Sequence, residues 1–223
     1  MIKALIFDID GTLIDSFEAY YTVFNEGIAD YNVEKVSRRD LRDLLAKGLS
    51  LRQILENVFT SPIDNVTYSM CREKILTLFR VAELEKIKPF PGTEELFRYL
   101  MTAGIKIGIA TGRTSSAEDE TLRFKKLGLY RYISAIVTSQ EIEHRKPAPD
   151  AIIECAKRMG IPIDKCIVVG DTESDIIAAK SAGAIAIAVT TGHEDEQTLL
   201  KARPEIVLKS MVELLSYLKK RGL

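Results

Sequence analysis

Residues 4–12 read Ala-Leu-Ile-Phe-Asp-Ile-Asp-Gly-Thr, an apolar run followed by an acidic one. Four consecutive apolar residues, Ala4–Phe7, are typical of a short strand that is buried on both faces, since a half-exposed strand would alternate apolar and polar residues. Two aspartates and a glycine follow directly, and these residue types favour turns. The stretch therefore predicts a buried strand that ends in an acidic loop.

Similar apolar runs recur along the chain, at Ile105–Ala110, Ile133–Val137, Cys166–Val169 and Ala184–Val189. Helical patterns lie between or after them, at Thr93–Thr102, Ser115–Leu127, Asp150–Met159, Glu173–Ala182 and Met211–Leu218. Several of these patterns end at a glycine, which is the usual stop signal of a helix. The alternation predicts an α/β fold, a Rossmann-like and mostly parallel sheet with helices on both faces.

Residues 15–86 interrupt this alternation, because they contain no convincing buried strand. Apolar side chains recur there at helical spacing, as at Phe17, Phe24 and Ile28, and residues 67–85 indicate one long helix. The return linker, Lys88–Gly92, has two prolines and a glycine, which suit an irregular hinge. We therefore predict a core domain of residues 1–14 and 87–223, with a small α-helical domain of residues 15–86 inserted into it.

Composition narrows the class of protein. The chain has 223 residues and 46% apolar residues, with 31 basic against 32 acidic side chains, so no basic field favours nucleic acid as a partner. No apolar stretch reaches the roughly 18 residues of a membrane span, and aspartates interrupt the first apolar run, unlike in a signal peptide. Cys71, Cys155 and Cys166 form no CxxC pair and are expected to be reduced. We expect a cytoplasmic monomer or homodimer with no membrane partner.

Polar side chains follow the predicted strands at their carboxyl ends, which is the edge where open parallel sheets bind ligands. They come from four separate segments of the chain, and they are Asp8, Asp10, Thr111, Lys146, Asp171 and Asp175. If the strands are neighbours, these segments place several carboxylates, a hydroxyl and an ammonium in one pocket. Arg113 and Arg145 lie nearby in sequence and could steer an anion at its mouth.

This mixture of groups has a specific chemical meaning. Clustered carboxylates repel one another unless a cation neutralises them, and Mg²⁺ takes carboxylate oxygens together with a substrate phosphate. A carboxylate can also attack phosphorus, if the metal and Lys146 supply positive charge around the phosphate. The Thr111 hydroxyl and backbone N–H groups at Gly11 and Gly112 could hold further phosphate oxygens.

The stretch DIDGTLIDS, from Asp8 to Ser16, resembles the first motif of the haloacid dehalogenase-like hydrolases, particularly their phosphoglycolate phosphatase branch. The other three motifs follow in order: Thr111, then Lys146 within RKPAPD, then GDTESD at residues 170–175. The resemblance covers essentially the whole chain, and it implies that the inserted helices form a cap.

The resemblance also implies a role for each of these side chains. Asp8 would be the nucleophile and a metal ligand, and Asp171 would be a further metal ligand. Asp10 would act as acid and base and bind the metal through its carbonyl. Thr111 and Lys146 would bind the transferring phosphoryl group, and Asp175 would orient Lys146 or a metal-bound water. An acid/base at position 10 argues against carbon–halogen cleavage, which needs none.

We therefore predict a Mg²⁺-dependent phosphatase that hydrolyses a small phosphorylated metabolite, best a phosphoglycolate-like phosphomonoester, through an aspartyl-phosphate. A phosphosugar mutase or a pyrophosphatase of the same family stays open, as does a non-catalytic binding module. The cap would choose the substrate. Its candidate loop is the turn 47–50, followed by Arg52, and Lys47 or Arg52 could pair with a carboxylate or second phosphate of the substrate. A plain turn between two helices explains the same residues.

Overall fold

The computed structural model describes residues 1–47, 49–59, 62–192 and 194–223. The chain divides into two compact units, one of Met1–Asp15 with Pro89–Leu223 and one of Ser16–Lys88. We call them the α/β unit and the helical unit. The divisions predicted from sequence lie after residues 14 and 86, and the two compact units divide after Asp15 and Lys88.

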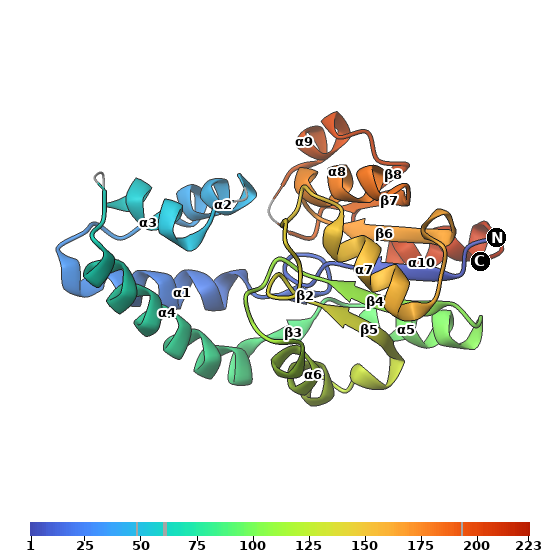
Figure 1. Cartoon of the computed structure of the whole chain (residues 1–223), viewed down its shortest axis with the longest axis horizontal. Coiled ribbons are helices and arrows are strands. Elements are labelled where there is room, and N and C mark those ends of the chain that lie inside the picture. The colour runs from blue at the N-terminus through green and yellow to red at the C-terminus, as the bar shows by residue number, and fades with distance from the viewer. Residues whose placement is uncertain (48, 60–61, 193) are drawn as a thin grey trace. The chain divides into compact units, whose positions relative to one another are not determined.

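One six-stranded sheet forms the centre of the α/β unit (Figure 1). Its strands are β1 (Ala4–Phe7), β4 (Lys106–Ala110), β5 (Ile133–Val137), β6 (Cys166–Gly170), β7 (Ile185–Val189) and β8 (Ile206–Leu208). They are ordered β5-β4-β1-β6-β7-β8, and every pairing is parallel. The predicted parallel sheet is confirmed. The sequence missed only β8 among these strands, whose three residues are too few for an apolar run.

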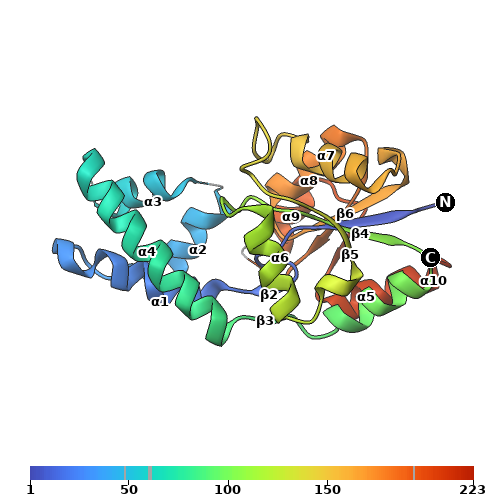
Figure 2. The same cartoon turned by 60° about the horizontal axis from the view of Figure 1, so that its bottom comes forward.

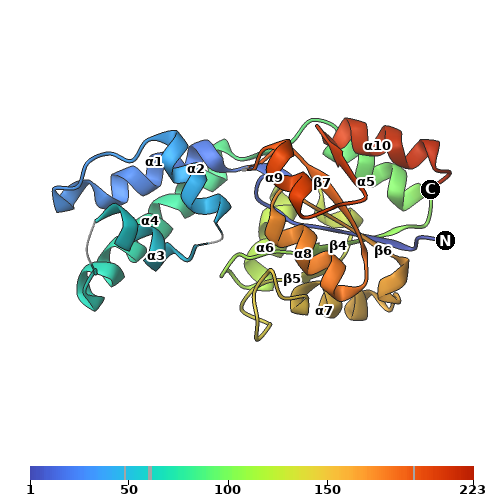
Figure 3. The same ribbon diagram turned by 90° about the horizontal axis from the view of Figure 1, so that it is seen from above.

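Helices cover both faces of this sheet. Figures 2 and 3 show α5 and α10 on one face and α7 and α8 on the other. The helices of the unit are α5 (Thr93–Thr102), α6 (Ala117–Lys126), α7 (Asp150–Met159), α8 (Glu173–Ala182), α9 (Glu196–Lys201) and α10 (Met211–Lys220), with short 3₁₀ turns at Tyr130–Tyr132 and Ile163–Lys165. The predicted two-sided covering is therefore confirmed.

Strand β1 lies at the centre of both apolar layers, and all four of its residues are fully buried. Ile6 packs with residues of α7 and α8, while the Phe7 ring lies 5.4 Å from the ring of Phe97 on α5. The N–H of Asp8 donates to the carbonyl of Val169 at 3.0 Å, which extends the pairing of β1 with β6 by one residue. The backbone is therefore fixed where the acidic loop begins.

The helical unit consists of α1 (Phe17–Ile28), a 3₁₀ turn (Ala29–Tyr31), α2 (Arg38–Ala46), α3 (Leu51–Val58) and α4 (Asn65–Lys86). Two short strands, β2 (Ile14–Asp15) and β3 (Lys88–Pro89), pair where the chain enters and leaves this unit. Ser50 starts α3 with a reciprocal hydrogen-bond pair to Gln53. Among the described residues, no helix has the length and apolarity needed to cross a bilayer.

Apolar side chains from the four helices form the core of this unit. Its fully buried members include Phe24, Leu41, Leu55 and Cys71. The two other cysteines are buried in the α/β unit, and all three are unpaired, as the sequence suggested. Helices α1 and α4 approach closely at Gly27, where an added Cβ would lie 2.2 Å from Cγ1 of Ile75. Ile75 is itself buried, so its β-branched side chain has little room to yield.

Gly27→Ala is therefore expected to lower the free energy of unfolding by about 1–3 kcal/mol, because overpacking outweighs the roughly 1 kcal/mol that alanine adds to helix propensity. Urea unfolding followed by circular dichroism measures the change. In an Ile75→Ala background the same substitution should cost less than half as much, because the obstructing atom is gone. Equal losses in both backgrounds would contradict this account of the contact.

Candidate active site

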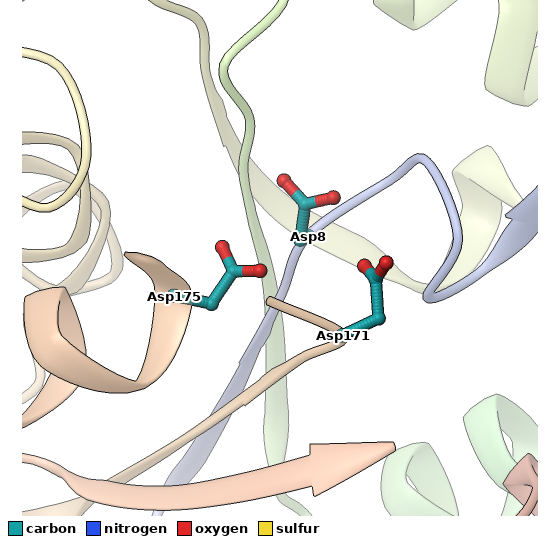
Figure 4. A group of neighbouring side chains, drawn as sticks. All are labelled: Asp8, Asp171 and Asp175. Carbon is teal, nitrogen blue, oxygen red and sulfur yellow. The ribbon is translucent and has the colours of Figure 1, made fainter. Parts of the chain in front are cut away.

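Three aspartates from two neighbouring segments meet at the carboxyl edge of the sheet. One carboxylate oxygen from each of Asp8, Asp171 and Asp175 lies within 4.8 Å of the other two, and Figure 4 shows the side chains converging. Asp8 follows β1 and Asp171 follows β6, and these strands pair in register from Ala4 to Phe7. Asp175 lies in the first turn of α8. This group of hard oxygen donors could hold a metal ion.

Lys146 extends into this acidic group from the loop that follows β5. Its Nζ lies 2.8 Å from Oδ1 of Asp8 and 2.7 Å from Oδ1 of Asp175, and it donates to the carbonyl of Ala110 at 2.8 Å. The peptide bond that joins it to Pro147 is cis. Burial alone would lower the pKa of Lys146, but the attraction of Asp175 and Asp8 outweighs burial and raises it. The side chain is therefore an ammonium.

The positive charge near the Asp8 carboxylate does not compensate for its burial and for the neighbouring negative charges. Burial raises the pKa of Asp8 to about 7, and repulsion from Asp175 and Asp10 contributes to the rise. Lys146 lowers the pKa but does not cancel burial. Three clustered carboxylates face one ammonium, so the group carries an excess of negative charge that a cation would neutralise.

The fully buried Asp171 carboxylate lies against Thr12 and two glycines. The Thr12 hydroxyl donates to its Oδ1 at 2.8 Å. A Cβ at Gly11 would lie 2.3 Å from Oδ2 of Asp171, and a Cβ at Gly192 would lie 1.8 Å from it. Gly11 also has a φ of +77°, which L side chains rarely adopt. Glycine is therefore required on both sides of this carboxylate.

Asp175 has hydrogen-bond partners for both of its oxygens. Oδ1 faces Lys146, and Oδ2 accepts from the N–H of Thr172 at 3.1 Å and from its hydroxyl at 2.6 Å. The Thr172 hydroxyl in turn accepts from the N–H of Asp175, which closes a capping box at the start of α8. Asp175 thus fixes both the start of α8 and the position of the Lys146 ammonium.

Asp10 points its carboxylate at Arg113 and not at the three clustered aspartates. Nε and Nη2 of Arg113 each donate to one carboxylate oxygen at 2.6 Å, in the bidentate geometry that arginine favours. The N–H of Arg113 donates to the hydroxyl oxygen of the buried Thr111 at 3.2 Å. An added Cβ at the intervening Gly112 would meet no atom within 4 Å, so this loop borders open space.

The fold and this arrangement agree with one known family. A sequence model described as haloacid dehalogenase-like hydrolase matches residues 5–189.

The chain belongs to the haloacid dehalogenase-like hydrolases.

Relatives within and around this family cover nearly the full chain. The hydrolase is 29% identical over 212 residues to phosphoglycolate phosphatase of Agrobacterium fabrum, with 94% of this chain and 89% of the relative covered. A solved hydrolase from Pseudomonas syringae is 27% identical with a TM-score of 0.79, and 98% of each chain is covered. A β-phosphoglucomutase from Clostridium difficile, 22% identical with a TM-score of 0.80 over 99% of this chain and 97% of that one, shares the fold.

These comparisons confirm the resemblance that the four motifs indicated. They also confirm the enzyme class, because the family and its phosphatase relatives make the chain a phosphoric monoester hydrolase. The residues assigned by motif now have positions in space. All six of those that follow strands belong to the α/β unit: Asp8, Asp10, Thr111, Lys146, Asp171 and Asp175.

The two predicted substrate contacts in the helical unit of the hydrolase have a different setting. Lys47 is exposed at the end of α2, and Gly48 in the same turn lies outside the described residues. Arg52 donates to the side chain of Asn65 and to the carbonyl of Ile63, and it stacks on the ring of Tyr68. Arg52 thus links α3 to the start of α4. Its contact with substrate stays a prediction.

The loop that follows β7 was missed from sequence. The Thr191 hydroxyl donates to the carbonyl of Gly11 at 2.6 Å, Gly192 borders Asp171, and Glu194 accepts from the N–H of Glu173 at 2.6 Å at the start of α8. Burial raises the pKa of Glu194 to about 7. The rule that ligands bind beyond strand ends would have pointed here, because this loop follows the fifth predicted strand.

Asp8→Asn is expected to stabilise the metal-free hydrolase at pH 8 by on the order of 1–3 kcal/mol. With its folded-state pKa raised to about 7 from an ordinary 3.8, Asp8 binds a proton more tightly in the folded state, so stability falls as pH rises between these values. Asparagine carries no such penalty. The gain should therefore shrink as pH is lowered from 8 to 4.

Chemical unfolding at pH 8, 6 and 4 in the presence of a chelator measures the difference. Asp164→Asn is the matched control, because that aspartate is exposed on the 3₁₀ turn before β6. A variant that is less stable than the parent at pH 8 would refute the proposed excess of negative charge.

Proposed function

We propose that this hydrolase is a Mg²⁺-dependent phosphatase that acts on a small phosphorylated metabolite, best a phosphoglycolate-like phosphomonoester, through an aspartyl-phosphate on Asp8. The observation that carries the proposal is the buried group in which Lys146 bridges Asp8 and Asp175 beside Asp171. It joins a carboxylate nucleophile, a fixed positive charge and oxygen donors for a hard cation in one place.

The residues present fit a magnesium ion. We assign the carboxylates of Asp8 and Asp171, with the backbone carbonyl of Asp10, as its protein ligands. The hydrogen bonds that Asp175 makes to Lys146 and Thr172 support a role in orienting rather than in binding the metal. When bound, the metal would neutralise the clustered carboxylates and withdraw charge from the substrate phosphate.

The two half-reactions then use side chains whose contacts are described above. A carboxylate oxygen of Asp8 forms a bond to phosphorus while the bond from phosphorus to the alcohol oxygen breaks, and Asp10 gives a proton to that oxygen. A water molecule then loses a proton to Asp10 and attacks phosphorus. The bond between phosphorus and Asp8 breaks, inorganic phosphate leaves, and both aspartates return to their starting state.

Two further groups would hold the phosphoryl group during transfer. The ammonium of Lys146 lies 2.8 Å from Asp8 and would neutralise charge on the equatorial oxygens. The Thr111 hydroxyl would donate to another of these oxygens, and the backbone N–H groups at Gly11 and Gly112 would bind the rest. We assign the helical unit the role of a cap that chooses the substrate, with Lys47 and Arg52 as its candidate contacts to a carboxylate or a second phosphate.

Phosphate release from a panel of phosphomonoesters, pyrophosphate and nucleotides tests this function. We expect turnover that requires Mg²⁺, is fastest with a carboxylated small phosphomonoester, and falls by at least about 1,000-fold in Asp8→Asn because the nucleophile is gone. Asp164→Asn should keep full activity. The absence of release from every panel member would refute a phosphatase, and transfer from a bisphosphorylated sugar to a second sugar would then identify a mutase.

Gly192→Ala is expected to weaken Mg²⁺ binding by about 10- to 100-fold, because the new methyl group would displace the Asp171 carboxylate. Isothermal titration of the protein with MgCl₂ measures the affinity directly. Gly112→Ala serves as the matched control for this titration, since its Cβ would meet no atom within 4 Å. Unchanged affinity in Gly192→Ala would argue against Asp171 as a ligand.

A further inference from the structure

Arg113 belongs to a row of alternating charges that runs from the acidic loop into α6. Its Nη1 lies 3.8 Å from Oε1 of Glu120, and Oε2 of Glu120 pairs with Nη1 of Arg123. The hydroxyl of Ser115 donates to Oε1 of the same glutamate. The order is therefore Asp10, Arg113, Glu120 and Arg123, negative and positive in turn.

The charged side chains of this row are largely buried, and burying a charge costs free energy. The Glu120 side chain is fully buried, and only 11% of the Arg113 side chain and 17% of the Arg123 side chain are exposed. An unpaired carboxylate in such a place would cost several kcal/mol, and apolar residues would stabilise the same space at least as well. Glu120 faces Nη1 of the Arg113 guanidinium, whereas Asp10 accepts from Nε and Nη2.

The backbone of Arg113 is held as firmly as its side chain. Its carbonyl accepts hydrogen bonds from the N–H of Ser139 at 3.0 Å and from the hydroxyl of Ser139 at 2.8 Å. Its N–H is bound by Thr111. The residue is thus fixed to the loops that follow both β4 and β5. Asp10, by contrast, precedes a glycine with a left-handed backbone and has 30% of its side chain exposed.

We propose that Arg113, held in place by Glu120, is the positioning residue that orients the Asp10 carboxyl group for proton transfer. The inference rests on the proposed function, in which Asp10 exchanges a proton with the leaving alcohol and then with water. Sequence suggested only that Arg113 could steer an anion at the mouth of the pocket. The bidentate contact assigns it to the acid/base itself.

The bidentate contact fixes the plane of the Asp10 carboxyl group, because both of its oxygens accept from Arg113. A protonated carboxyl group has one oxygen that donates and one that can only accept. Guanidinium N–H groups are donors only, so each Asp10 oxygen accepts from Arg113 with one lone pair and keeps its other lone pair for the proton that Asp10 exchanges. That proton passes to the alcohol oxygen as its bond to phosphorus breaks, and Asp10 recovers a proton from the attacking water.

The dependence of rate on the leaving group separates this role from a structural one. p-Nitrophenolate leaves without protonation, whereas an alkoxide needs the proton from Asp10. Arg113→Ala should lower kcat/KM for an alkyl phosphate by about 100-fold or more and for p-nitrophenyl phosphate by less than about 5-fold. Because kcat/KM reports the steps up to transfer of phosphate to Asp8, slower hydrolysis of the phosphoenzyme does not enter the comparison.

Three further variants complete the test. Arg113→Lys keeps the charge without the bidentate contact and should show the same selective loss, and it replaces Arg113→Ala if that variant does not fold. Glu120→Gln should show a smaller loss of the same kind. Arg131→Ala removes an exposed arginine that pairs with Glu94 and should leave both substrates unaffected.

A loss of equal size on both substrates, or no loss, would overturn the inference while the proposed function stands. Mg²⁺ affinity measured by titration should be unchanged in Arg113→Ala, and a large fall would place Arg113 with the metal site instead. Absence of turnover in the parent enzyme would remove the proposed function and the inference together, and the Asp8→Asn comparison identifies that case.

Discussion

The structure depends on the concentration of negative charge at the end of one buried strand. Strand β1 is enclosed on four sides. Apolar layers cover both of its faces, and β4 and β6 pair with its two edges. Asp8 is therefore held at a fixed point in a largely dry environment, beside Asp171 and Asp175. The residues nearby accommodate this charge. A buried ammonium and two hydroxyls donate to the aspartates, and two glycines leave room for the Asp171 carboxylate.

Charge also explains why the four aspartates of the site have such different surroundings. Asp175 is engaged on both oxygens by Lys146 and Thr172, and Asp10 is engaged on both by Arg113. Asp8 is paired with Lys146, and Asp171 accepts from the Thr12 hydroxyl and lies against Gly11 and Gly192. One residue type is thus held in four different settings, and the neighbours of each carboxylate underlie the different roles that we propose for them.

Much of this arrangement could be predicted from sequence, because it depends on local patterns. Ala4–Phe7 and Ile133–Val137 are strands as predicted, and the runs of apolar residues that identified them reflect burial on both faces. The convergence of Asp8, Lys146 and Asp171 followed from the rule for strand ends. What could not be predicted depends on contacts between distant residues. The pairing of Arg113 with Asp10 and the approach of Gly192 to Asp171 leave no trace in the spacing of residues, and β8 is too short to form a pattern.

The parallel order of the sheet has a consequence for the way the protein is made. Among the six strands of this sheet the central one comes first in the sequence, and its partners follow about 100 and 160 residues later, at β4 and β6. Until those partners are made, the apolar residues of β1 have no sheet to join, whereas the helical unit needs only the contacts within Ser16–Lys88. Because contact order is high in one unit and low in the other, we expect the inserted helical segment to gain its structure before the segment that carries Asp8.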